Sequence, residues 1–244
     1  RRREPDMVAN GQDVLESPGG RQAAAQAARA ELYGLLSGAF ARELTQDAWV
    51  RLCSDETRAS LVELAVACGV GDEAGPLLQC LTSSRDLDPG TTVEEMAVDY
   101  ARLFIGPGPG LAPPYESVYT SPERRFYGEA LGDVTTWLRT EGVRVGDEFH
   151  APADHIAVEL AIMQHLALES AEQLAAGDAP EALAKRLKFL DRHLRRWVPE
   201  WVVDVRAGAA TAFYREAASL LDEYLQRDEA WLRHAMHVPR RAAF

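Results

Sequence analysis

The chain has 244 residues, 47% of them hydrophobic and 26% charged, which is typical of a soluble globular protein and argues against a disordered one. Its formal net charge is -12, and no basic patch or stripe interrupts that acidity, which argues against nucleic-acid binding. The apolar runs fall short of the roughly 20 residues that span a bilayer.

Residues 1–20 are polar and contain several Gly and Pro residues, which is typical of a polar N-terminal tail. The adjacent arginines at the start have no apolar segment behind them, so they do not form a secretory signal. The three cysteines lack the spacing of a zinc site, and their odd number argues against a disulfide framework. These features favour a reducing compartment, and we expect a cytoplasmic protein.

From Arg21 onward, apolar residues recur at the three- to four-residue spacing of an α-helix. No stretch alternates convincingly as a strand does, and no internal repeat is found. We therefore predict an all-α fold, a single globular domain of about nine or ten helices over residues 21–240, with a hinge near 141–151. The helical stripes lie, in chain order, at 28–40, 49–70, 71–91, 93–104, 126–138, 156–166, 183–197 and 213–224.

Proline, glycine and serine mark where some of these helices should begin and end. Gly106 should end the helix before it. Ser121, as an N-cap ahead of Pro122, should start the next helix. Pro152 and Pro199 should each begin a further long helix.

The sequence offers no strong catalytic pattern. The segment GPGPG (106–110) lacks the order GxxxxGK[ST] of a phosphate loop, and its prolines remove amides that would bind phosphate. His155 and Glu159 stand four apart on one helix face, and with His165 they offer an alternative, an α-helical metal-dependent enzyme. Asp154 is also explained as a carboxylate that favours a helix dipole. Because Asp154 and His155 belong to no apolar stripe, we expect the fold to survive their loss.

The least ordinary stretch is YARLFIGPGPGLAPPYESVY (100–119), which holds four prolines and three tyrosines. A backbone fixed by proline loses little entropy on binding, and tyrosine combines a large contact area with a polar tip. These are properties of a peptide-docking surface, whereas a mere connection between helices is usually shorter and more polar.

Two motifs give the sequence a resemblance to a known family. YARLF followed by PPYESVY is similar to the Y/W-x-x-L-F … P-P-Y/W-x-S-x-Y/W signature of the TorD/DmsD redox-enzyme maturation chaperones. APADH is similar to that family's E-x-P-x-D-H or E-P-x-D-H signature, although Ala151 stands where the family has Glu. The resemblance covers roughly residues 25–230.

The resemblance implies a cytoplasmic chaperone that is not an enzyme and has no cofactor of its own. Its partners would be the apo catalytic subunit of a molybdenum-containing oxidoreductase and the subunit's twin-arginine signal peptide or a related N-terminal segment. The chaperone would assist cofactor insertion and delay export until the subunit is folded. A weak contact with a nucleotide or the molybdenum cofactor stays open, as does the choice between monomer and homodimer.

By motif, the resemblance also implies which residues bind the peptide. Tyrosine and proline would contact its apolar part, and the acidic surface would attract its arginines, an attraction that salt screens. The residues implied are Tyr100, Leu103, Phe104, Pro114, Tyr115, Ser117, Tyr119, Gly128, Pro152, Asp154 and His155.

Overall fold

Helices make up the regular structure of the computed structural model, which describes residues 18–106, 110–146, 149–176 and 180–237. These residues contain eleven α-helices and no strand, so the all-α prediction is confirmed. A π-helical turn, η1 (Ala101–Ile105), continues one of the helices. The α-helices are α2 (Pro18–Ala41), α3 (Gln46–Leu52), α4 (Asp55–Cys68), α5 (Gly75–Ser83), α6 (Pro89–Tyr100), α7 (Glu116–Thr120), α8 (Glu129–Glu141), α9 (Ile156–Ala175), α10 (Pro180–Arg192), α11 (Leu194–Gly208) and α12 (Ala212–His237). Most of the expected tail, residues 1–17, lies outside the described residues.

Short polar side chains fix where several helices begin. Thr45 Oγ1 accepts a hydrogen bond from the Ala48 N–H (3.2 Å) at the start of α3, and Ser54 and Asp88 cap α4 and α6 in the same way. These caps satisfy amides that have no partner inside the helix. α4 ends at Gly69, whose φ of +78° lies in the left-handed region that glycine adopts without strain.

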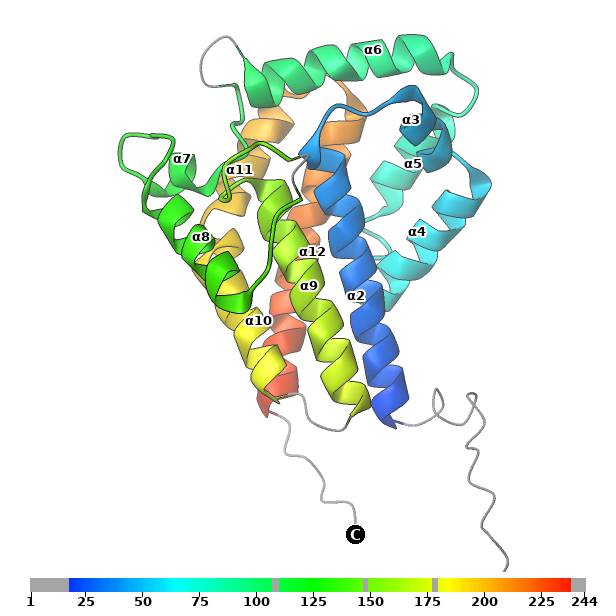
Figure 1. Ribbon diagram of the computed structural model, residues 1–244. Helices are drawn as coiled ribbons and strands as arrows, with labels where there is room; N and C mark the ends of the chain where they lie inside the picture. The colour runs from blue at the N-terminus through cyan, green and yellow to red at the C-terminus, as the bar shows by residue number, and fades with distance from the viewer. Residues whose placement is uncertain (1–17, 107–109, 147–148, 177–179, 238–244) are drawn as a thin grey trace, which may run out of the picture.

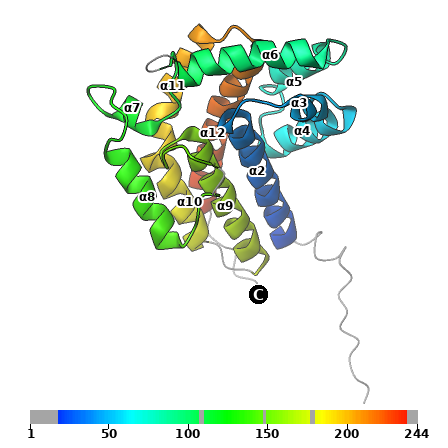
Figure 2. The ribbon, with the colours of Figure 1, turned by 45° about the horizontal axis from the view of Figure 1, so that its top comes forward.

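The centre of the molecule is built on α2 and α9, which lie side by side and run in opposite directions (Figure 1). A Cβ at Gly34 of α2 would stand 2.6 Å from the Gln164 side chain of α9, so glycine permits this close approach. α10, α11 and α12 pack against one another and around this pair. α6 crosses one end of the bundle, α3 to α5 cover one flank, and α7 and α8 cover the other (Figures 1 and 2).

A buried ion network ties α2, α10 and α12 together. Two hydrogen bonds of 2.6 Å join Arg186 Nη2 to the two carboxylate oxygens of Asp228. Arg29 Nε (3.1 Å) and the Tyr33 hydroxyl (2.7 Å) donate to the same carboxylate. All four residues are buried, and a buried charge without its partner is strongly destabilising. The network therefore fixes how these three helices align.

Three of the expected helix starts are wrong. Residues 121–128 form turns and bends, and α8 begins only after Gly128. Pro152 lies in a turn ahead of α9, which starts at Ile156. Pro199 lies inside α11 rather than opening the last helix.

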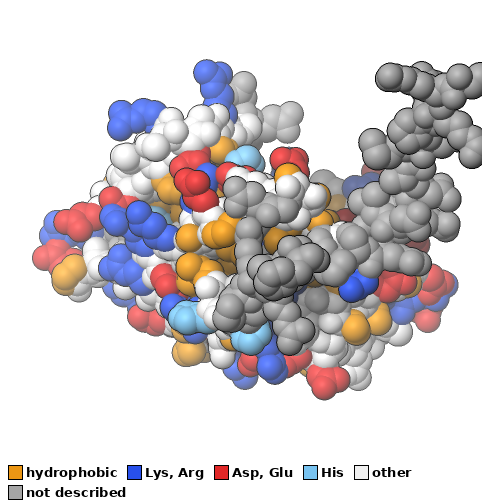
Figure 3. All heavy atoms as spheres, turned by 90° about the horizontal axis from the view of Figure 1, so that it is seen from below, with side chains coloured by type: hydrophobic (Ala, Val, Ile, Leu, Met, Phe, Trp, Pro, Cys, Tyr) orange, Lys and Arg blue, Asp and Glu red, His pale blue; other side chains and the backbone are white. Residues whose placement is uncertain are grey.

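Acidic and basic side chains are intermixed on the face that Figure 3 shows. Seen from the end of the bundle where α2 begins, both signs of charge lie around apolar side chains (Figure 3). The negative net charge is therefore not gathered into a field of one sign on this face. None of the helices in the described part of the chain is long and apolar enough to cross a membrane.

Candidate functional site

The segments PPYESVY and APADH, singled out in the sequence, meet in a short antiparallel pairing. The Glu116 N–H donates to the Asp154 carbonyl (2.9 Å), and the Ile156 N–H donates to the Pro114 carbonyl (2.8 Å). Tyr115 and His155 thus form an isolated antiparallel bridge. The pairing joins the start of α7 to the start of α9, although α8 lies between them in the chain.

Asp154 caps α7 from this distant part of the chain. Its Oδ2 accepts a hydrogen bond from the Ser117 N–H (3.1 Å), whereas Tyr115 at the N-cap position provides no side-chain cap. Ser117 Oγ accepts in turn from the Gly128 N–H (3.0 Å). Asp154, Ser117 and Gly128 therefore form one continuous chain of contacts.

His155 is buried at the N-cap of α9. Its Nδ1 accepts a hydrogen bond from the Ala157 N–H (3.1 Å), which requires an unprotonated nitrogen, and burial lowers the pKa of His155 to about 4. Asp154 and His155 are only 1% and 4% exposed. We expected the fold to tolerate their loss because neither belongs to an apolar stripe, but both are buried and each side chain caps a helix.

The first motif, YARLF, faces the interior. Tyr100, Leu103 and Phe104 are buried in the core. Residues 110–112 fold back over them, since the Ala112 N–H donates to the Leu103 carbonyl (2.8 Å). Gly110 passes so close that a Cβ there would overlap with the same carbonyl oxygen. These core residues therefore anchor the loop from its inner side.

The residues implied to bind peptide divide into a buried and a half-buried group. The buried residues position the others, and they are Tyr100, Leu103, Phe104, Pro114, Ser117, Asp154 and His155. The half-buried residues reach the surface, and they are Tyr115, Tyr119, Gly128 and Pro152. Contact with a peptide stays a prediction for all of them.

A row of aromatic rings crosses the paired segments, and we call it the aromatic row. In order, its members are Phe149, His155, Tyr115, Phe126 and Tyr127, whose neighbouring ring centroids lie 5.2, 5.0, 5.4 and 6.5 Å apart. The row begins half-buried and ends in the open, where Phe126 is 38% exposed and Tyr127 is 74% exposed. The pairing holds the backbone in place at two members of the row, Tyr115 and His155.

Sequence reasoning missed three members of this row, Phe126, Tyr127 and Phe149. It placed Phe126 and Tyr127 on the apolar face of a helix, yet Tyr127 and Arg124 have φ values of +63° and +50°. Such left-handed residues interrupt a right-handed helix. The available signal was the polar segment 122–125 directly before the two aromatic residues, which lacks the apolar partners that a helical stripe requires.

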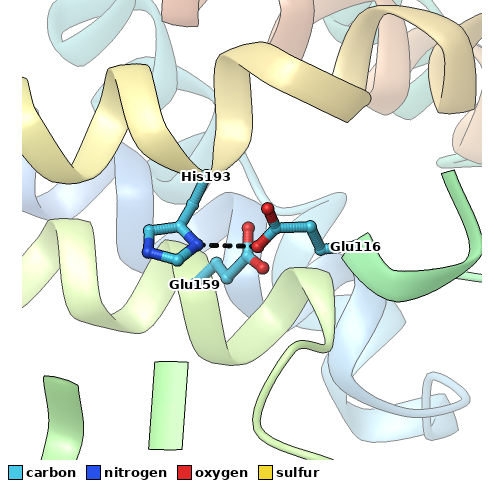
Figure 4. Close-up of side chains that lie close together, drawn as sticks. All are labelled: Glu116, Glu159 and His193. Carbon is cyan, nitrogen blue, oxygen red and sulfur yellow. Dashed lines mark hydrogen bonds and ion pairs between the residues drawn. The ribbon is translucent and has the colours of Figure 1, made fainter. Parts of the chain in front are cut away.

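Behind the pairing, Glu116, Glu159 and His193 come together from α7, from α9 and from the residue before α11 (Figure 4). His193 Nδ1 lies 2.7 Å from Glu116 Oε2, and Trp197 Nε1–H donates to Glu159 Oε2 (3.0 Å). The Oε1 atoms of both glutamates are buried without a hydrogen-bond partner. Burial, followed by the charge of Glu116, raises the pKa of Glu159 well above its ordinary value. Burial beside Glu116 therefore favours the protonated, uncharged form of Glu159.

The same three residues are the one group in the described part of the chain whose ligand atoms, all within 4.8 Å of one another, could hold a metal ion. One oxygen of each glutamate and Nδ1 of His193 are already engaged in the contacts above, so we assign no metal to them. The set expected for a metal-dependent enzyme is not assembled, because His165 is exposed whereas Glu159 is fully buried. That alternative is wrong in its choice of ligands.

Comparison with known proteins identifies the class. The family described as nitrate reductase delta subunit matches residues 63–203. The chaperone protein TorD of Vibrio vulnificus (strain YJ016) is 30% identical over 204 residues, 84% of this chain and 94% of that relative. TorD of Shewanella sp. (strain MR-4) is 30% identical over 215 residues, 86% of this chain and 96% of that relative. The protein is an all-helical chaperone and not an enzyme. It belongs to the TorD/DmsD family of redox-enzyme maturation chaperones.

Proposed function

We propose that this protein is a cytoplasmic chaperone for the catalytic subunit of a molybdenum-containing oxidoreductase. It binds the twin-arginine signal peptide of that subunit, or a related N-terminal segment. By holding this segment it assists insertion of the cofactor and delays export until the subunit is folded. The observation that supports the proposal is the aromatic row, which runs from the paired Tyr115 and His155 to the exposed rings of Phe126 and Tyr127.

The row suits an apolar peptide for two physical reasons. Aromatic faces bury a large area for few rotatable bonds, and a tyrosine can also satisfy a peptide amide with its hydroxyl. The hydrogen bonds at Glu116 and Ile156 already order the backbone at Tyr115 and His155, so little further entropy is lost there on binding. The net charge of -12 attracts a basic segment to the protein.

Replacement of Tyr115, in the middle of the row, tests the proposal. The probe is a labelled synthetic peptide with two adjacent arginines followed by leucines and alanines. Tyr115→Ala should weaken its binding by about 1–3 kcal/mol, the effect of losing an interface anchor, and Tyr115→Phe should retain most of the affinity. Fluorescence anisotropy measures both values.

Val66→Ala provides a matched control, because Val66 is an exposed apolar side chain on α4, on the flank away from the row. It should bind the probe as the wild type does. If Tyr115→Ala also binds the probe with unchanged affinity while its urea-unfolding midpoint is normal, the peptide docks elsewhere and the proposed site is wrong.

A further inference from the structure

We propose that Glu200, Asp204 and the ring of Tyr119 form a binding site for an arginine side chain of the client segment. The chain's own Arg124 occupies this site until the client displaces it. The inference rests on the function proposed above, because that function supplies the client segment. None of these four residues belongs to the aromatic row or to the buried Glu116–Glu159–His193 group.

The guanidinium of Arg124 is bound on three sides. Its Nη2 lies 3.0 Å from Glu200 Oε1 and 3.0 Å from Asp204 Oδ2. Its Cζ lies 4.8 Å from the centroid of the Tyr119 ring. Carboxylates and an aromatic face are the groups that recognise a guanidinium in proteins. The site is therefore identified by the arginine that it already holds, and not by its acidity alone.

The residues that bind the guanidinium, Tyr119, Glu200 and Asp204, form the acceptor side of this site. They are held in place independently of Arg124. The Tyr119 hydroxyl donates to Asp204 Oδ2 (3.1 Å), and its ring stacks on Trp197 with centroids 5.6 Å apart and planes at 30°. Trp197 is fully buried. Glu200 and Asp204 stand four residues apart and so share one face of α11. The site consequently keeps its shape when Arg124 leaves.

Arg124 itself is held in a manner that favours exchange. Its φ of +50° lies in the left-handed region, which strains a residue other than glycine. Its side chain is 52% exposed and that of Glu200 is 62% exposed, and ion pairs this accessible to water add little to stability. A guanidinium from another chain can therefore replace that of Arg124 at small loss.

The site also continues the aromatic row. Tyr119 follows Tyr115 by about one helical turn of α7, and Arg124 precedes Phe126 by two residues in the same turn segment. A peptide whose apolar part lies on the row brings an adjacent arginine to Tyr119. Release of Arg124 would then relieve the strain in the segment that carries Phe126 and Tyr127.

Removal of Arg124 gives the central test. Arg124→Ala frees the site and should raise affinity for the synthetic peptide with two adjacent arginines about two- to fivefold, as expected for loss of an exposed ion pair. Arg125→Ala is the matched control, because it removes the same charge one residue away, where the side chain pairs, within the described part of the chain, only with Glu123. Arg125→Ala should produce less than half of the gain in peptide affinity that Arg124→Ala produces.

The acceptor side is tested by Glu200→Gln combined with Asp204→Asn. This double variant should bind the arginine peptide several-fold more weakly. It should bind a peptide with glutamines in place of the arginines as the wild type does. Both results, obtained by fluorescence anisotropy, would support the arginine site.

Two other results would overturn the arginine site while leaving the proposed function standing. One is an equal gain from Arg124→Ala and Arg125→Ala, which net charge alone explains. The other is equal binding of the arginine and glutamine peptides by the wild type and every variant. If neither the wild type nor Arg124→Ala binds any of the peptides, the proposed function fails together with the site.

Discussion

Glu159 shows what burial does to a single side chain. It is fully buried beside Glu116, and its pKa is raised well above the ordinary value. In the unfolded chain the same carboxyl ionises near its usual pKa of about 4.3. Above that pH the folded protein holds a proton that the unfolded chain has released. The free energy of unfolding therefore falls as pH rises, until the pKa of the folded state is passed.

Glu159→Gln removes this dependence, because an amide has the shape of the protonated acid and does not ionise. We expect the variant to exceed the wild type in stability at neutral pH. The difference should grow by up to about 1.4 kcal/mol per pH unit above the unfolded pKa. Urea unfolding at several pH values between about 5 and 8 measures it. Glu172→Gln, on the exposed side of the same helix, should follow the wild type. If the Glu159→Gln and wild-type curves are parallel, Glu159 is ionised in the folded protein.

For single residues, the sequence indicated which positions belong to the candidate site. It did not indicate whether a side chain is buried or which partner it binds. The motifs point to Asp154 and Ser117, yet the hydrogen bond that joins them spans 37 positions, and no local pattern encodes it. Because that contact is tertiary, the sequence did not indicate that Asp154 is buried. The same holds for Arg124, whose partners Glu200 and Asp204 lie 76 and 80 positions away.

The helices themselves were predictable wherever an apolar stripe continued for several turns, as it does in α9 and α12. The prediction of a helix over 121–128 failed because of contacts that the local sequence does not encode. Ser121 does accept a hydrogen bond from the Arg125 N–H (2.8 Å), so the capping signal was present. The left-handed backbone of Arg124 then ends the turn, and the Gly128 N–H is bound by Ser117 instead of by a helix. A distant contact thus outweighed a weak local preference.

Alanine substitutions at two glycines distinguish the effect of loop packing on stability from the effect of helix preference. Gly110→Ala should lower the free energy of unfolding by about 1–3 kcal/mol, since the new methyl group overlaps with the backbone carbonyl of Leu103. In Gly132→Ala, inside α8, the new methyl group has no neighbouring side chain within 4 Å. This variant should raise the free energy of unfolding by about 0.5–1 kcal/mol. Urea unfolding compares the two variants. A Gly110→Ala variant as stable as the wild type would show that the loop is not anchored on Leu103.

Across the whole molecule, the Asp228 carboxylate is the point where three helices depend on one another. Arg29 from α2 and Arg186 from α10 both bind it, and the residues are buried. Within the described residues, neither arginine forms an ion pair with another carboxylate. The packing of the N-terminal helix and that of the C-terminal helix therefore form a single cooperative unit.

Asp228→Asn should lower the free energy of unfolding by about 3–5 kcal/mol, because it leaves buried arginines without a counter-charge. That is a large part of the roughly 5–15 kcal/mol that stabilises a typical protein. Asp222→Asn is the control on the same helix, since its ion pair with Arg195 is 24–25% exposed and should contribute less than about 1 kcal/mol. Thermal unfolding followed by circular dichroism checks both. Equal melting temperatures for the two variants would contradict a central role for Asp228.

The same network sets an order of events during protein synthesis. Arg29 leaves the ribosome 199 positions ahead of Asp228, an interval of about 10–40 s at the usual speed of translation. α2 can pair with α9 before then, but the charge of Arg29 has no carboxylate in this network until α12 has been made. The nascent chain therefore remains incompletely folded during this interval, when it can aggregate or be bound by other chaperones. A chaperone built in this way needs, for that interval, the kind of protection that we propose it gives to its client.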